Sequence, residues 1–233
     1  MIKLIMSDNE KIIFLHIPKT AGTSLRLIIE QEYQPEDCLF LYYPVYDEIT
    51  IAEIQLQLSK AKVLYGHLTF GVHELFNITG KYITFLRHPI DRVISFYKYS
   101  ACDLDSPYYA HIQNGLSLVE MLQQEITIQT NNHMTRILAN YWQEDRLDDI
   151  QFVDKALENI LNNFYYVGLL EKFNDSIEQL GKKLNWKNSY EIPHINANTY
   201  KKSFKIDSTT QAVLEQYNYL DLLLYEAIKN KFY

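Results

Sequence analysis

Four short apolar runs, separated by segments of helical periodicity, constrain the fold of this chain more than any other feature. They lie near residues 12–17, 62–66, 81–86 and 165–169. Uninterrupted apolar runs of this length are typical of strands buried on both faces, as in parallel sheets covered by helices. With 233 residues and 47% hydrophobic content, the chain can bury one sizeable core. We therefore expect a single three-layer α/β domain over residues 1–233, with a mainly parallel central sheet flanked by helices.

The segments between the apolar runs predict helices at residues 23–33, 47–60, 89–101, 117–124, 130–140, 148–162, 173–185 and 208–231. The last is the longest, with one apolar face formed by Tyr217, Leu220, Leu224 and Ile228. No internal repeat or low-complexity tract interrupts this pattern. The alternation of strands and helices places the carboxyl ends of the strands at one edge, where sheets of this class bind ligands.

A small, hydroxyl-rich loop follows the first apolar run, within residues 11–27. Pro18 and Gly22 indicate a tight turn, and Thr23 or Ser24 can cap the helix that follows. Because the turn ends on a helix N-terminus, unpaired backbone N–H groups and the positive end of the helix dipole converge there. The loop therefore predicts a phosphate or sulfate site, which makes the expected fold P-loop-like.

Side chains of this loop supply further donors to an anion. They are the ammonium group of Lys19 and the hydroxyl groups of Thr20, Thr23 and Ser24. The order differs from the Walker A motif GxxxxGK[ST], in which the lysine stands at the end of the loop, because Lys19 precedes Gly22. The loop therefore indicates anion binding without the signature of an NTPase.

A second strand, turn and helix follow in residues 81–100, with Pro89 at the favoured first helical position. Where an NTPase usually carries a metal-binding aspartate, this chain has Arg87, whose guanidinium group suits an anion. Ser95 lies about two turns into the helix, roughly 9 Å along its axis from Pro89. Its hydroxyl can meet the same phosphate as Arg87 only if the ligand lies along the helix.

At these two segments the chain resembles the sulfotransferases that use 3'-phosphoadenosine 5'-phosphosulfate (PAPS), most closely the branch of heparan sulfate and uronyl 2-O-sulfotransferases. The first match is residues 18–24, PKTAGTS, and the second is Arg87 followed eight positions later by Ser95. The resemblance implies that Pro18, Lys19, Thr20, Gly22, Thr23 and Ser24 bind the 5'-phosphosulfate. It also implies that Arg87 and Ser95 bind the 3'-phosphate.

The resemblance extends to Gly66 and His67, which follow the apolar segment 63–65. In the 2-O-sulfotransferase branch a Gly-His pair at this place supplies the base that deprotonates the acceptor hydroxyl. An unperturbed imidazole titrates near pH ~6.5, which suits His67 to that role. A weaker likeness covers residues 164–186 and 194–202, where the family folds a basic loop over the nucleotide, and it adds Thr199 and Lys201 to the expected donor-binding residues. The chain departs from the eukaryotic pattern at His16 and Asn196, where basic residues are common.

The implied reaction moves a sulfuryl group from PAPS to a hydroxyl-bearing acceptor, with Lys19 and His67 as the catalytic residues. Sulfuryl transfer resembles phosphoryl transfer, in which positioning and electrostatic stabilisation dominate. Because the sulfuryl group carries less charge than a terminal phosphate, we expect no requirement for magnesium. The sequence also has no HExxH motif, cysteine pair at zinc spacing or acidic calcium loop, so no metal site is expected.

The charge of the chain bears on its acceptor. The formal net charge is −7, with 22 Lys and Arg against 29 Asp and Glu, which disfavours attraction of a polyanion or of nucleic acid. A carbohydrate or another small hydroxyl compound is therefore the expected acceptor. The chain has no apolar run of about 20 residues and no signal-peptide pattern at its start, so a cytoplasmic location without a membrane span is expected. Cys38 and Cys102 are expected to be reduced.

Other interpretations of the same residues stay open. The Lys19 loop can be an ordinary turn, Arg87 can pair with Asp91, and His67 can be a hydrogen-bonded strand end. If His67 is not the base, His73 and Glu74 are the next candidates. At the level of function, the alternatives are a P-loop-like small-molecule kinase and a nucleotide-binding module without catalysis. The acceptor, the oligomeric state and the role of residues 101–163 are not specified by the sequence.

Overall fold

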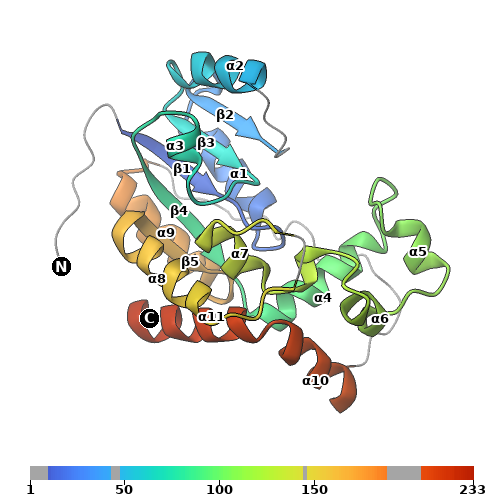
Figure 1. The fold of residues 1–233 in the computed structure, drawn as a ribbon. Helices are drawn as coiled ribbons and strands as arrows, with labels where there is room; N and C mark the ends of the chain where they lie inside the picture. The colour runs from blue at the N-terminus through green and yellow to red at the C-terminus, as the bar shows by residue number, and fades with distance from the viewer. Residues whose placement is uncertain (1–9, 43–47, 144–145, 188–205) are drawn as a thin grey trace. The chain divides into compact units, whose positions relative to one another are not determined.

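The computed structural model describes residues 10–42, 48–143, 146–187 and 206–233. Within these ranges five parallel strands form one sheet in the order β2-β3-β1-β4-β5, which can be followed across Figure 1. The strands are β1 (Lys11–Leu15), β2 (Cys38–Leu41), β3 (Val63–Gly66), β4 (Gly80–Leu86) and β5 (Phe164–Leu169). The predicted α/β fold with a parallel sheet is confirmed, and β2 is a strand that the sequence analysis did not predict.

The described helices lie close to the predicted segments, with α3, α5 and three short 3-10 turns in addition. The α-helices are α1 (Gly22–Glu32), α2 (Glu48–Leu58), α3 (Val72–Leu75), α4 (Pro89–Ser100), α5 (Tyr109–Gln113), α6 (Leu118–Gln123), α7 (His133–Ala139), α8 (Gln151–Asn163), α9 (Phe173–Leu184), α10 (Ser208–Tyr217) and α11 (Tyr219–Phe232). The 3-10 turns are η1 (Pro35–Asp37), η2 (Ile128–Thr130) and η3 (Leu170–Lys172).

The single helix predicted over residues 208–231 is wrong, because the chain breaks at Asn218 between α10 and α11. The Asn218 side-chain amide donates to the carbonyl oxygens of Thr130 and Leu214, at 3.1 and 3.0 Å. The Asn132 side-chain oxygen accepts from the backbone N–H of Leu220 at 2.9 Å, so it satisfies a donor in the first turn of α11. These contacts with a distant segment end one helix and start the next.

The described chain forms two compact units. The first comprises residues 1–86 and 158–193 and contains the sheet, and the second comprises residues 87–157 and 194–233, each within its described ranges. The interpretation of residues 1–233 as one domain stays a prediction. None of the described helices combines the length and the apolar character that crossing a membrane requires.

Alternating residues of the strands place the core of the first unit on both faces of the sheet. On one face, side chains of β1, β3, β4 and β5 pack against α1 and α9; this cluster is Ile12, Phe14, Leu25, Ile28, Ile29, Val63, Tyr65, Ile83, Phe85, Tyr166, Ile177 and Leu180. On the other face Tyr82 stacks on Phe164 and contacts Phe70, with ring centroids 5.1 and 5.2 Å apart. The sheet is therefore a rigid support for the loops that follow its strands.

The second unit has a helical core of its own. It is formed mainly by α4, α6 and α10, and its buried residues are Ile90, Val93, Ile94, Phe96, Tyr97, Ala101, Ile112, Leu118, Met121, Leu122 and Leu214. Asp221 is buried at the start of α11, and its carboxylate accepts from the backbone N–H groups of Met134 and Thr135 at 3.1 and 2.7 Å. A negative charge at the N-terminus of α7 is favourable, so this contact helps to order the unit.

Replacing Gly66 by alanine is expected to destabilise the protein by about 1–3 kcal/mol, a typical cost of overpacking. A Cβ atom at Gly66 would lie 1.6 Å from the carbonyl oxygen of Leu41, and a backbone atom within a sheet cannot move away easily. Urea denaturation measures the change. Gly181→Ala is the matched control, because its Cβ atom would lie 3.5 Å from Trp186, an ordinary contact. Equal stabilities of the two variants would contradict this account of Gly66.

Candidate functional site

The loop between β1 and α1 has a curled backbone. Lys19 and Ala21 adopt the left-handed conformation, with φ of 73° and 66°, which non-glycine residues rarely do. The Thr20 hydroxyl group is buried and donates to the carbonyl oxygen of Ile17 at 2.8 Å, so it holds the curve from inside. Strained backbone of this kind persists where the surroundings enforce it and is frequent at ligand-binding sites. The backbone of the loop is therefore held in a curled conformation ahead of α1.

The prediction that Thr23 or Ser24 caps this helix is wrong. α1 begins at Gly22, and its N-cap is Ala21, which has no side-chain capping bond. Because Lys19 and Ala21 turn the chain through left-handed conformations, the helix starts before Thr23, and both predicted caps lie in its first turn. The N-terminal N–H groups of α1 therefore open onto the loop that carries Lys19.

Two histidines lie together where β1 and β3 end. His16 follows β1, and its backbone N–H donates to the carbonyl oxygen of Gly66 at 2.8 Å. His67 follows β3, and its backbone N–H donates to the carbonyl oxygen of Leu41 at 3.0 Å. The ring centroids of His16 and His67 are 5.1 Å apart. The parallel register of β1 and β3 thus brings two imidazoles to one edge of the sheet.

Aromatic rings pack against both histidines, and the start of α1 packs against His16. Tyr65 stacks on His16 at 5.6 Å between ring centroids, and Tyr42 meets His67 edge to face at 5.3 Å. The Tyr65 hydroxyl group donates to the carbonyl oxygen of Gly22 at 2.8 Å, which ties β3 to the start of α1. A Cβ atom at Gly22 would lie 2.0 Å from Nε2 of His16, so only a glycine lets this ring lie against the helix. The Lys19 loop and the base expected at His67 therefore belong to one packed assembly.

Both imidazoles are neutral at pH 7. Burial, the His67 ring and the Lys19 ammonium group lower the pKa of His16 to about 3. Partial burial lowers the pKa of His67, and Lys19 lowers it further, although part of the His67 surface is exposed to solvent. Lys19 therefore acts electrostatically on both rings, and His67 is in the proton-accepting form that a general base needs.

We expect the free energy of unfolding to fall more steeply on acidification in the wild-type protein than in a His16→Phe variant. The unfolded chain binds a proton at His16 below its ordinary pKa of ~6.5, whereas the folded chain resists protonation down to about 3. The contribution of the neutral His16 ring to the free energy of unfolding is thus fully present above about pH 6.5 and is lost as the pH falls toward about 3. Denaturation at several pH values between 7 and 4 measures the difference. Parallel curves for the two proteins would contradict the burial of a neutral His16.

The second predicted segment starts immediately after β4. Arg87 follows Leu86, the last residue of β4, and the predicted start of the next helix at Pro89 is confirmed. Ser95 is half-buried on α4. Arg92, on the same helix, is buried, and burial lowers its pKa to about 10, with Asp221 opposing the change and Arg87 adding to it. Arg87 and Ser95 belong to the second unit, and their joint binding of one phosphate stays a prediction.

Four further residues were predicted from the sequence, two for donor binding and two as alternative bases. Thr199 and Lys201 lie outside the described residues, so their roles stay predictions. His73 packs against Tyr82, and its Nδ1 atom lies 2.7 Å from the Tyr82 hydroxyl oxygen. Tyr82 is the third residue of β4 and pairs with Ile13 in the middle of β1, so this contact does not lie at the carboxyl ends of the strands, where His16 and His67 lie. Glu74 lies next to His73, with an oxygen 3.8 Å from its Nε2.

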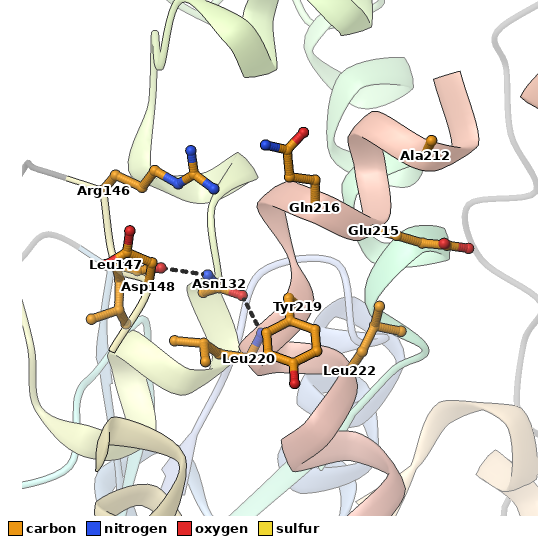
Figure 2. A pocket seen from close by; sticks show the side chains of 10 residues that line it. All are labelled: Asn132, Arg146, Leu147, Asp148, Ala212, Glu215, Gln216, Tyr219, Leu220 and Leu222. Atoms are coloured by element: carbon orange, nitrogen blue, oxygen red, sulfur yellow. Dashed lines mark hydrogen bonds between the residues drawn. The ribbon is translucent and has the colours of Figure 1, made fainter. Parts of the chain in front are cut away.

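A cavity of about 490 Å³ lies in the second unit, between the segment 146–148 and the junction of α10 and α11 (Figure 2). Arg146, Glu215 and Gln216 are among its lining residues, and Figure 2 shows the Asn132 side chain between Leu147, to which it donates, and Leu220, from which it accepts. None of the described residues predicted for the donor site lines this cavity. Among the described residues, no group of three or more His, Cys, Asp or Glu side chains is arranged to hold a metal ion.

The sequence analysis did not identify Tyr42, Tyr65 or the ring of His16 as parts of the site. Tyr42 follows β2, the strand that was not predicted, and Tyr65 was assigned only to an apolar strand. His16 was noted as a departure from a family pattern, and no local signal in the sequence places its ring beside His67. An imidazole that directly follows a buried strand is the sequence signal that could have marked His16, whereas no such signal marks Tyr42 or Tyr65.

Comparison with a family model identifies the family of this chain, and comparison with solved structures shows a similar fold. A family model described as "Sulfotransferase family" matches residues 3–233. A sulfotransferase structure from Alicyclobacillus acidocaldarius is similar at a TM-score of 0.54 and 15% identity, over 97% of this chain and 98% of that one. A mouse sulfotransferase, SULT7A1 complexed with PAP, is similar at a TM-score of 0.48 and 15% identity over 79% of this chain, which spans 62% of the mouse chain. A search of curated proteins found no match.

Proposed function

Because the chain belongs to the sulfotransferase family, we propose that it transfers a sulfuryl group from PAPS to a hydroxyl group of an acceptor. One observation supports this proposal above the others. The strained loop carrying Lys19, the N-terminus of α1 and the neutral His67 meet where neighbouring strands end, so an anion site adjoins a proton acceptor. Transfer of an anionic group to a hydroxyl needs both.

For the donor, we assign the 5'-phosphosulfate to the loop residues Pro18, Lys19, Thr20, Gly22, Thr23 and Ser24. Thr20 takes part through its backbone, because its hydroxyl hydrogen is committed to Ile17. We assign the 3'-phosphate to Arg87 and Ser95, and we assign Thr199 and Lys201 to donor binding without a more specific role. β1 and β4 are adjacent parallel strands, and the Lys19 loop and Arg87 each directly follow one of them.

For the chemistry, His67 takes the proton as the acceptor O–H bond breaks and the new O–S bond forms. The S–O bond to the 5'-phosphate breaks in the same displacement, and adenosine 3',5'-bisphosphate (PAP) leaves. Lys19 and the N–H groups of α1 stabilise negative charge on the sulfuryl oxygens and on the departing phosphate. The use of His67 as base is the role that the Gly-His pair has in the 2-O-sulfotransferase branch, and we propose that this chain is most similar to that branch.

For the acceptor, we propose a neutral carbohydrate or another small hydroxyl compound. The formal net charge of −7 opposes long-range attraction of a polyanion, and the aromatic residues beside His67 offer faces on which a sugar ring or an apolar ring can stack. The acceptor class is tested by comparing neutral sugars, phenols and sulfated or carboxylated polysaccharides in one assay.

The deciding experiment incubates the protein with PAPS and this acceptor panel in excess EDTA and measures the formation of PAP. Sulfotransferase activity is expected to persist in EDTA, because Lys19, Arg87 and the N–H groups of α1 supply the positive charge. The kinase alternative is tested beside it with ATP and magnesium. Phosphorylation of an acceptor by ATP, without sulfuryl transfer from PAPS, would replace the proposed function.

Replacing Arg87 by alanine is expected to weaken PAP binding by about 10- to 100-fold, the range for losing a charged hydrogen-bonding partner. The affinity for AMP, which lacks the 3'-phosphate, should change little. Calorimetry of both nucleotides with both proteins measures this difference. Arg146→Ala, which removes a cation elsewhere in the second unit, is the matched control. An equal loss of affinity for PAP and AMP would remove Arg87 from the 3'-phosphate site.

A further inference from the structure

We propose that His16 is a positioning residue, whose ring fixes the orientation of the His67 imidazole and connects it to the donor-binding loop. This inference rests on the proposed function, in which His67 is the general base. His16 contacts both the proposed base and the start of the helix that follows the donor-binding loop. On one side its ring lies 5.1 Å from the ring of His67, and on the other its Nε2 edge lies against Gly22, the first residue of α1.

His16 itself is held from several directions. Tyr65 stacks on its ring with an interplanar angle of 17°, and the backbone N–H of His16 donates to Gly66 in the neighbouring strand. The Tyr65 hydroxyl group is in turn fixed to the carbonyl oxygen of Gly22. A ring fixed by a sheet and by a helix has little rotational freedom, so it can restrict the freedom of the ring packed on it. His67 is held less completely, because part of its surface is exposed.

A neutral neighbour suits a base that becomes charged. His67 gains a positive charge when it accepts the acceptor proton, and Lys19 already opposes that charge. The titratable rings that contact His67 are His16, which follows β1, and Tyr42, which follows β2; behind them, Tyr65 of β3 stacks on His16. Burial raises the pKa of Tyr65 and lowers that of His16, so both rings stay uncharged in the working range of pH. His16 therefore packs against the base without adding a second cation.

The test records the imidazole signals of His67 by NMR between pH 4 and 8 in the full-length wild-type protein and in two variants. In His16→Ala, the loss of the packed ring should increase the exposure of His67, raise its pKa toward the ordinary value and change its tautomer ratio. In His16→Phe, which keeps a planar ring, His67 should titrate as in the wild type. His73→Ala is the matched control, since it removes a histidine packed against aromatic rings at a distance from His67.

Turnover of PAPS provides the second measurement. His16→Ala should lower kcat by about tenfold or more through misorientation of the base, with KM for PAPS unchanged, and His16→Phe should restore most of the rate. Unchanged His67 signals in His16→Ala, or a loss of kcat in His16→Phe as large as in His16→Ala, would overturn the positioning role. If His16→Ala does not fold, His16→Leu, which also lacks a planar ring, replaces it in both measurements with the same expected results.

The two proposals fail in different ways. The NMR titration requires neither a donor nor an acceptor, so it reports on His16 and His67 even if the protein transfers no sulfuryl group. Absence of PAP binding and of turnover in the wild-type protein would remove the proposed function and, with it, the catalytic meaning of this packing. Normal wild-type turnover with unaltered His67 signals in His16→Ala would remove only the inference about His16.

Discussion

Replacing Lys19 by alanine is expected to lower kcat for sulfuryl transfer by about a hundredfold or more, the usual cost of removing a preorganised group that stabilises a transition state. The left-handed backbone at Lys19 sets the direction in which its side chain leaves the loop, and its ammonium group acts electrostatically on His16 and His67. Lys19 is thus the cation through which the loop acts on the proposed base. Single-turnover kinetics with PAPS measure the loss at the chemical step.

Lys62→Ala is the control for Lys19→Ala. Lys62 precedes β3 at the amino end of the sheet, where its ammonium group lies 3.0 Å from Asp37, and it is mostly exposed. Its removal costs a surface ion pair, so kcat should stay within about twofold of wild type. A Lys19→Ala enzyme with the kcat of Lys62→Ala would show that the loop binds the donor without taking part in the transfer.

Replacing His67 by alanine is expected to abolish measurable turnover, or to reduce kcat by about 10²- to 10⁴-fold, because general-base catalysis is lost. The wild-type kcat/KM should be level above the pKa of His67 and fall as the pH drops below it. Since burial and Lys19 lower that pKa, the fall should begin below the ordinary histidine value of ~6.5. The residual activity of His67→Ala should lack this acid limb.

His73→Ala serves as the matched histidine control and should retain the wild-type pH profile. The Nδ1 atom of His73 lies 2.7 Å from the hydroxyl oxygen of Tyr82, which is level with the middle of β1 and not with the strand ends beside His67. Full turnover by His67→Ala would move the role of base to another residue. Loss of the acid limb in His73→Ala would identify that residue as His73.

The sheet could be predicted because its strands are buried on both faces and read as apolar runs. β2 escaped prediction for the opposite reason, since it is a short edge strand and all of its residues are only half-buried. Its parallel pairing with β3, which sets its register, is a contact between distant segments. The break at Asn218 also depends on contacts between distant segments. The helical periodicity of the sequence continues through it, but the Asn218 side chain bonds to the carbonyl oxygen of Thr130 and the Asn132 side chain bonds to the N–H of Leu220.

The candidate site was predictable in its residue types and not in its packing. The Lys19 loop and His67 follow strand ends, and a strand end can be recognised in a sequence. The predicted caps at Thr23 and Ser24 were wrong, because the helix starts earlier, at Gly22. That early start depends on the left-handed backbone of Lys19 and Ala21, which residues of these types rarely adopt. The contact between His16 and His67 depends on the register of β1 against β3 and on the space left by Gly22.

The central claim is that separate turns hold the two phosphates of one adenosine nucleotide, and calorimetry with the wild-type protein tests it most directly. PAP, AMP and adenosine 2',5'-bisphosphate are titrated into the same preparation. We expect PAP to bind at least about tenfold more tightly than either, because only PAP presents phosphates at both the 5' and 3' positions. Equal affinities for the three nucleotides would contradict the claim.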